Sequence, residues 1–95
     1  MSAYLIVDIE VIDAASYEQY RKQVPALLAA YGGRYLVRGG RTELLEGIGE
    51  PNRTVVLEFP SMERLKAFYD SAEYAPLKLQ RISATRSRIF AVEGM

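Results

Sequence analysis

One short segment of the chain, FYDSAEYAPLKLQR at residues 68–81, carries most of the side chains that could do chemistry. It holds two tyrosines, two carboxylates, a serine, a lysine and an arginine. Phenols and guanidinium groups donate hydrogen bonds to oxyanions, and a carboxylate can act as a general base. The segment therefore predicts a site for a small molecule that carries, or develops, negative charge.

In this functional interpretation Tyr69 and Tyr74 are phenolic donors, and Arg81 clamps an anion. Either Asp70 or Glu73 is the general base. Arginines elsewhere in the chain can serve the same site, because an inward-facing Arg38 would hold a carboxylate or enolate by a forked hydrogen bond. The candidate ligand-binding residues are Arg38, Tyr69, Ser71, Tyr74 and Arg81.

A purely structural interpretation of the same segment remains open. Tyr69 continues an apolar helical stripe and belongs to the core, while Ser71 caps a following short helix. Glu73 then lies in a first turn, where a carboxylate interacts favourably with the helix dipole. The arginines have a structural alternative too, since Arg38 and Arg88 can form buried or dimer-interface ion pairs with acids of other strands. Those acids are Asp8, Glu10 and Glu58.

Composition excludes several chemistries. The chain has no cysteine and no histidine, which rules out disulfides, thiolate nucleophiles, Ser-His-Asp triads and sulfur-ligated zinc. No spaced cluster of acids of the EF-hand kind is present, so we expect no metal and no cofactor. Twelve basic and twelve acidic side chains cancel, and no basic stripe accompanies the strands, so we expect no nucleic acid partner.

The first residues, MSAYLIVDIEV, hold an apolar run that is short and interrupted by acids. A membrane-spanning helix needs about 20 apolar residues, and a signal peptide needs a basic start. We therefore expect a cytoplasmic protein with no membrane partner.

The hydrophobic pattern predicts the order β-α-β-β-α-β. Alternating apolar residues indicate strands at 3–11, 34–38, 53–60 and 84–94, and a further short strand after the turn at Gly39-Gly40. Three- and four-residue spacing indicates helices at 13–33 and 61–71, with a shorter one after Ser71. We expect Asp13 or Ser16 to cap the first helix, Gly32-Gly33 to end it, and Pro25 to kink or divide it.

This order is typical of a ferredoxin-like α+β sandwich, with a four-stranded antiparallel sheet and helices on one face. The predicted domain spans residues 1–95. Neither 53–59 nor the last strand has a fully polar face, so the sheet's second face needs a cover. We expect that cover to be a second copy of the chain, in a homodimer formed through the sheet faces.

Three segments resemble domain-of-unknown-function family 1330: YGGRYLVRGG, RTVVLEFPS and FYDSAEYAPLKLQR. The resemblance runs from Tyr4 to Val92, and Phe68 replaces a tryptophan that family members often carry. It implies a protomer of the dimeric α+β barrel superfamily, whose sheets pair across a dimer. It implies no established activity, because that superfamily includes cofactor-independent monooxygenases, isomerases, haem-degrading enzymes and proteins without a known reaction.

Two functional hypotheses follow. The first is an enzyme that acts on a small hydrophobic, carboxylated or enolisable compound without metal or nucleotide, in a pocket between sheet and helices. The second is a non-catalytic dimeric module for ligand sensing or assembly, in which every candidate residue has a structural role.

Overall fold

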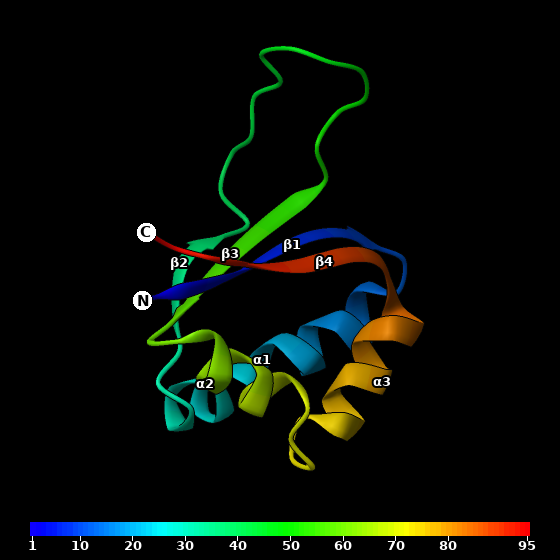
Figure 1. The fold of residues 1–95 in the computed structure, drawn as a ribbon. Helices are drawn as coiled ribbons and strands as arrows, with labels where there is room; N and C mark the ends of the chain where they lie inside the picture. The colour runs from blue at the N-terminus through cyan, green and yellow to red at the C-terminus, as the bar shows by residue number, and fades with distance from the viewer.

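A computed structural model describes residues 1–95 (Figure 1). Four strands and three helices follow one another in the order β1 (Ala3–Val11), α1 (Ala14–Ala30), β2 (Arg34–Arg38), β3 (Arg53–Phe59), α2 (Met62–Tyr69), α3 (Ala75–Ala84) and β4 (Thr85–Glu93). None of the helices is both long and apolar enough to cross a membrane.

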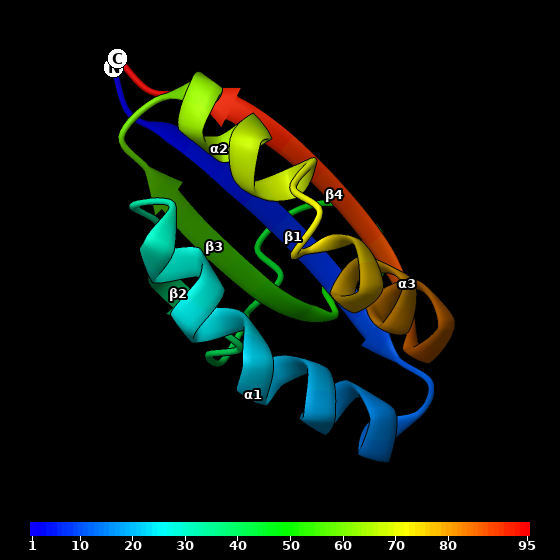
Figure 2. The ribbon, with the colours of Figure 1, turned by 90° about the horizontal axis from the view of Figure 1, so that it is seen from below.

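The strands form one antiparallel sheet in the order β2-β3-β1-β4, and all three helices cover the same face (Figures 1 and 2). The two long central strands are β1 and β3, paired from Ala3–Phe59 to Ile9–Arg53. The predicted ferredoxin-like α+β fold is therefore confirmed. The sequence left open which strand face meets the helices, and the structure settles this.

Odd-numbered residues of β1 and β3 point toward the helices. Leu5, Val7 and Ile9 alternate with half-buried neighbours, and Val55 and Leu57 do the same on the adjacent strand. This follows from the two-residue period of a strand. We call the helix-covered side the inner face and the opposite side the outer face.

Helix α1 begins as predicted, with the Asp13 carboxylate accepting the Ser16 N–H at 3.1 Å. The expectation that Pro25 divides the helix is wrong, because α1 runs unbroken past it. Proline cannot bond the carbonyl four residues earlier, which here belongs to Arg21. The Arg38 guanidinium donates to that carbonyl oxygen at 3.1 Å instead, so a side chain of β2 replaces the missing helical bond.

The end of α1 depends on two glycines. Gly32 has φ +81°, the left-handed conformation that the sequence predicted for a helix end. Gly33 allows close packing, because a Cβ there would lie 2.8 Å from Cε1 of Phe59 in the core. The chain can therefore turn directly from α1 into β2 above a packed aromatic ring.

The predicted short strand after Gly39-Gly40 is wrong. Residues 39–52 hold no strand and form a loop that projects away from the helices (Figure 1). Pairing of β2 with β3 stops at Arg38–Val55, and beyond that point no core lies beneath the chain. Leu45 is 86% exposed, so its apolar side chain has no surface of this protomer to cover.

The segment from α2 to α3 is built by two serines. Ser61 caps α2 as predicted, accepting the Arg64 N–H at 3.1 Å. Ser71 caps a turn ahead of α3: its Oγ accepts the Tyr74 N–H at 3.1 Å and donates to the Phe68 carbonyl at 2.8 Å. Because this turn is tight, Phe68 and Tyr74 both point into the core, with ring centres 4.7 Å apart.

Candidate functional site

A cavity lies between the inner face of the sheet and the helices. About 40 Å³ of it can hold the centres of water-sized molecules, and the empty space there, with open solvent included, is about 500 Å³. A water requires roughly 10–15 Å³ by the first measure. The closed part therefore holds a few waters, and a larger ligand needs the side chains at the opening to move.

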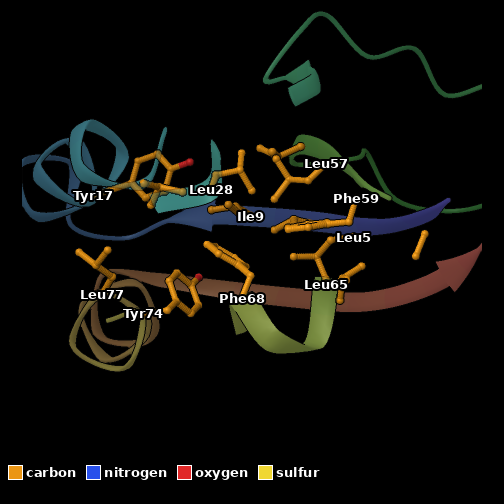
Figure 3. Close-up of a cluster of buried hydrophobic side chains, with 14 of the residues drawn as sticks. Leu5, Ile9, Tyr17, Leu28, Leu57, Phe59, Leu65, Phe68, Tyr74 and Leu77 are labelled. Carbon is orange, nitrogen blue, oxygen red and sulfur yellow. The ribbon is translucent and has the colours of Figure 1, made fainter. Parts of the chain in front are cut away.

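The walls of this cavity are mostly apolar. Three strands and two helices contribute to them: Leu5, Val7, Ile9, Val24, Val55, Leu57, Phe68 and Ile89. Of these, Figure 3 labels Leu5, Ile9, Leu57 and Phe68. In Figure 3, Tyr17 from α1 and Tyr74 from the turn before α3 enter the same space from opposite sides. Such walls suit a hydrophobic ligand body, and a few polar groups then set its orientation.

Arg81 of α3 is the buried charge of the cavity. Only 4% of its surface is exposed, and no carboxylate lies within ion-pair distance of it. Its Nε donates to the hydroxyl of Tyr74 at 3.4 Å, a long hydrogen bond. Burial works against the charge, but the phenol oxygens of Tyr74 and Tyr20 more than offset this and raise the pKa of Arg81. The guanidinium therefore stays charged without an anion beside it.

Two phenols extend this cluster. The hydroxyls of Tyr20 and Tyr74 lie 2.7 Å apart. Burial raises the pKa of Tyr20 well above its usual range, and Tyr74 adds to the shift, so Tyr20 remains protonated. The two phenols carry two hydroxyl protons, and the hydrogen bond between them uses one, so one O–H is left over whichever phenol donates to the other. Tyr74 accepts from Arg81 in either case. The cluster thus offers a phenolic O–H in addition to the guanidinium.

Three more arginines line the cavity toward solvent. Arg21 is paired with Glu18 on the same helix at 2.8 Å. Arg38 is exposed, and its Cζ lies 4.5 Å from the centre of the Tyr35 ring. Arg53, at the start of β3, lies over Tyr17 at 5.8 Å and has a buried Nε without a hydrogen-bond partner. We call the region around Arg38 and Arg53 the mouth.

The chain matches the family described as "Domain of unknown function (DUF1330)" over residues 2–95. It belongs to the DUF1330 family. A search of curated proteins finds no match.

Solved structures share the fold of this DUF1330 protein at low identity. A protein of unknown function from Rhodopseudomonas palustris is 15% identical, with a TM-score of 0.82 over 99% of this chain and 82% of that one. SnoaB, a cofactor-independent oxygenase from Streptomyces nogalater, is 13% identical, with a TM-score of 0.66 over 99% and 93%. A dimeric ferredoxin-like protein of unknown function from Jannaschia sp. CCS1 is 14% identical, with a TM-score of 0.66 over 99% and 100%.

In this DUF1330 protein the structure brings three predicted site residues together at the cavity: Arg38, Tyr74 and Arg81. Tyr69 lies outside, in a surface groove between α2 and β4, with the Lys78 ammonium 4.0 Å from its ring centre. The hydroxyl of Ser71 is already used in two hydrogen bonds of the turn before α3.

The acids proposed as general base also lie elsewhere. Asp70 follows the end of α2 on the surface, and Glu73 accepts a hydrogen bond from Tyr31 at 3.3 Å. Neither lines the cavity. The expected strand ion pairs differ as well, since Glu58 pairs with Arg34 at 2.6 Å and Arg38 points to the inner face.

Sequence reasoning missed Tyr20 and Arg53 as site residues. Tyr20 fits the apolar spacing of the helix predicted at 13–33, but a tyrosine at a core position also brings a hydroxyl that needs a partner. Arg53 is in phase with the inward-facing Val55 and Leu57. An arginine in phase with core residues was the signal that could have found it.

Replacing Arg81 with methionine tests whether the charge of Arg81 destabilises the folded protein. A buried cation without a counterion costs free energy, and methionine keeps most of the volume. We expect Arg81→Met to raise the free energy of unfolding by about 1–3 kcal/mol in urea denaturation. Arg64→Met, at an exposed arginine of α2, is the control and should stay within about 0.5 kcal/mol. A loss of stability in Arg81→Met would make Arg81 a structural residue.

Proposed function

We propose that this protein binds a small hydrophobic organic anion, a carboxylate or an enolate, in the cavity between sheet and helices. The observation that supports the proposal is the buried Arg81 guanidinium, which has no carboxylate beside it. Natural proteins rarely keep a buried charge unpaired. A ligand carboxylate against Arg81 would supply the missing charge, and the free phenolic O–H would donate to the same group.

A catalytic use of the same cluster is the second candidate. A guanidinium and a phenol directed at one oxygen would stabilise an enolate, which is the intermediate that an enolisable substrate forms. The fold shared with SnoaB, a cofactor-independent oxygenase, supports chemistry without metal or nucleotide. No carboxylate lines the cavity and the chain has no histidine, so a substrate would lose its proton to solvent.

Ligand binding is tested with benzoate, and benzyl alcohol serves as the neutral probe of similar size. We expect calorimetric titration at fixed ionic strength to show benzoate binding that falls about 10–100-fold in Arg81→Met, the range for a charged hydrogen-bonded pair. Tyr20→Phe and Tyr74→Phe should each cost about 3–10-fold. Equal affinity for benzoate and benzyl alcohol in the wild type, or benzoate binding unchanged in Arg81→Met, would contradict the proposal.

We also propose that the protein is a homodimer joined through the outer faces of its sheets. Phe90 and Val92 of β4 are 50% and 45% exposed there, and Ile6 and Val56 lie in line with Phe90 across the neighbouring strands of the same face. Asp8 lies on the same face with a buried Oδ1 that has no partner. Arg88 is its cross-strand neighbour, yet the two form no ion pair. A second copy would bury the apolar residues and bring further donors near Asp8.

The dimer is tested by placing a charge in this face. Wild-type protein at micromolar concentration should sediment as a dimer, and Phe90→Asp as a monomer, because the carboxylate would be buried against apolar side chains. Leu79→Asp, at an exposed position of α3 away from the sheet, should remain dimeric. A monomeric wild type, or a Phe90→Asp variant that still dimerises, would rule out this interface.

A further inference from the structure

The mouth of the cavity carries positive charge, and no carboxylate belongs to its lining. Four arginines line the cavity and no aspartate or glutamate does. Arg81 is buried deepest, and Arg21 has its own carboxylate in Glu18. Arg38 and Arg53 are left with no acid within ion-pair distance.

Packing, and not a counterion, fixes the position of Arg53. Gly39 has φ +71°, and a Cβ built on it would collide with the Arg53 guanidinium, so the side chain lies directly against the glycine backbone. On its other side is the ring of Tyr17. The Nε hydrogen is buried without an acceptor. A guanidinium held in this way carries a planar fork of donors, which matches a planar oxyanion.

Arg38 and Arg53 are neighbours on the inner face. Arg38 pairs with Val55 across the strands, and Arg53 stands two residues earlier on the same strand and face. Diagonal neighbours in a sheet are about 7–8 Å apart at the backbone, which is within reach of two long side chains. Their guanidinium groups carry like charges and repel each other, and an anion between them would relieve that repulsion.

We propose that Arg38 and Arg53 form a second anion subsite, so that the ligand of this protein carries two carboxylates at opposite ends of a short apolar body. One carboxylate lies against Arg81 and the tyrosine pair inside the cavity. The other is held at the mouth, and the apolar body lies against the aliphatic and aromatic walls. This inference rests on the proposed binding of an anion at Arg81.

The preference for a diacid follows from charge. A monocarboxylate neutralises the charge of Arg81 but does not relieve the repulsion between Arg38 and Arg53 at the mouth. A neutral ligand neutralises none of these charges. A second carboxylate can accept two parallel hydrogen bonds from a guanidinium, which is the strongest pairing available to arginine. Arg38 already donates one N–H to the Arg21 carbonyl, which keeps its guanidinium near the mouth.

The test compares diacids with their monomethyl esters, which have nearly the same shape and one charge fewer. The probes are phthalate, isophthalate and terephthalate, because the three isomers place the second carboxylate at different distances. We expect at least one diacid to bind wild-type protein about tenfold more tightly than its monoester by calorimetric titration at fixed ionic strength.

Single substitutions show which residues make the diacid bind more tightly than its monoester. Arg53→Met and Arg38→Met should each reduce the ratio of diacid to monoester affinity below about threefold. Arg64→Met, which removes a charge far from the mouth, should retain it. Arg38→Met carries the test alone if Arg53→Met fails to fold.

Three negative results are distinguishable. If the monoesters bind through Arg81 and no diacid binds more tightly, the mouth subsite is refuted while the proposed function stands. If the advantage persists in both Arg53→Met and Arg38→Met, the subsite is refuted as well. If neither diacids nor monoesters bind, both the inference and the proposed function fall.

Discussion

The guanidinium of Arg81 lies inside the protein without a carboxylate beside it. Water cannot fully hydrate it there, and its single side-chain partner is the oxygen of Tyr74. A group of this kind is tolerated only where the surrounding fold holds it in place and something compensates the charge. Several features of the structure, from the serine turn before α3 to the tyrosine pair, are arranged around this one position.

The devices that shape the cavity are irregularities of the backbone. Pro25 removes a helical hydrogen bond and so frees the carbonyl that holds Arg38. Gly39 has no side chain, which leaves room for Arg53 to lie against the backbone. Ser71 makes the turn that directs Tyr74 inward. Each device positions a polar group at a cavity whose walls are otherwise apolar, which is how small-molecule sites are generally built.

The fold could be read from the sequence because it depends on periodicity. The alternation in β1 and β3 and the helical stripes predicted the sheet and the helices, and caps such as Asp13 and Ser61 lie where expected. The short strand predicted after the Gly39-Gly40 turn is absent from the loop at 39–52, since its apolar residues find no partner strand. A short apolar pattern in the sequence does not show whether a partner strand lies beside it, because strand pairing depends on the whole sheet.

The site was less predictable for a related reason. Residues 68–81 pointed to Tyr74 and Arg81, which do meet at the cavity, but not to Tyr20, whose hydroxyl comes from 54 residues away in the chain. Arg53 and Arg38 become neighbours only through the register of β2 on β3. Contacts of this range are fixed by tertiary packing, and a single sequence does not contain the register.

A crystal structure with 4-bromobenzoate tests the central claim most directly, because the bromine atom reports its own position by anomalous scattering. The account predicts a bromine peak inside the cavity and the carboxylate within about 3 Å of the Arg81 guanidinium. A structure in which Arg81 is paired with a carboxylate of the protein, from its own chain or from a partner, and no bromine enters the cavity would contradict it.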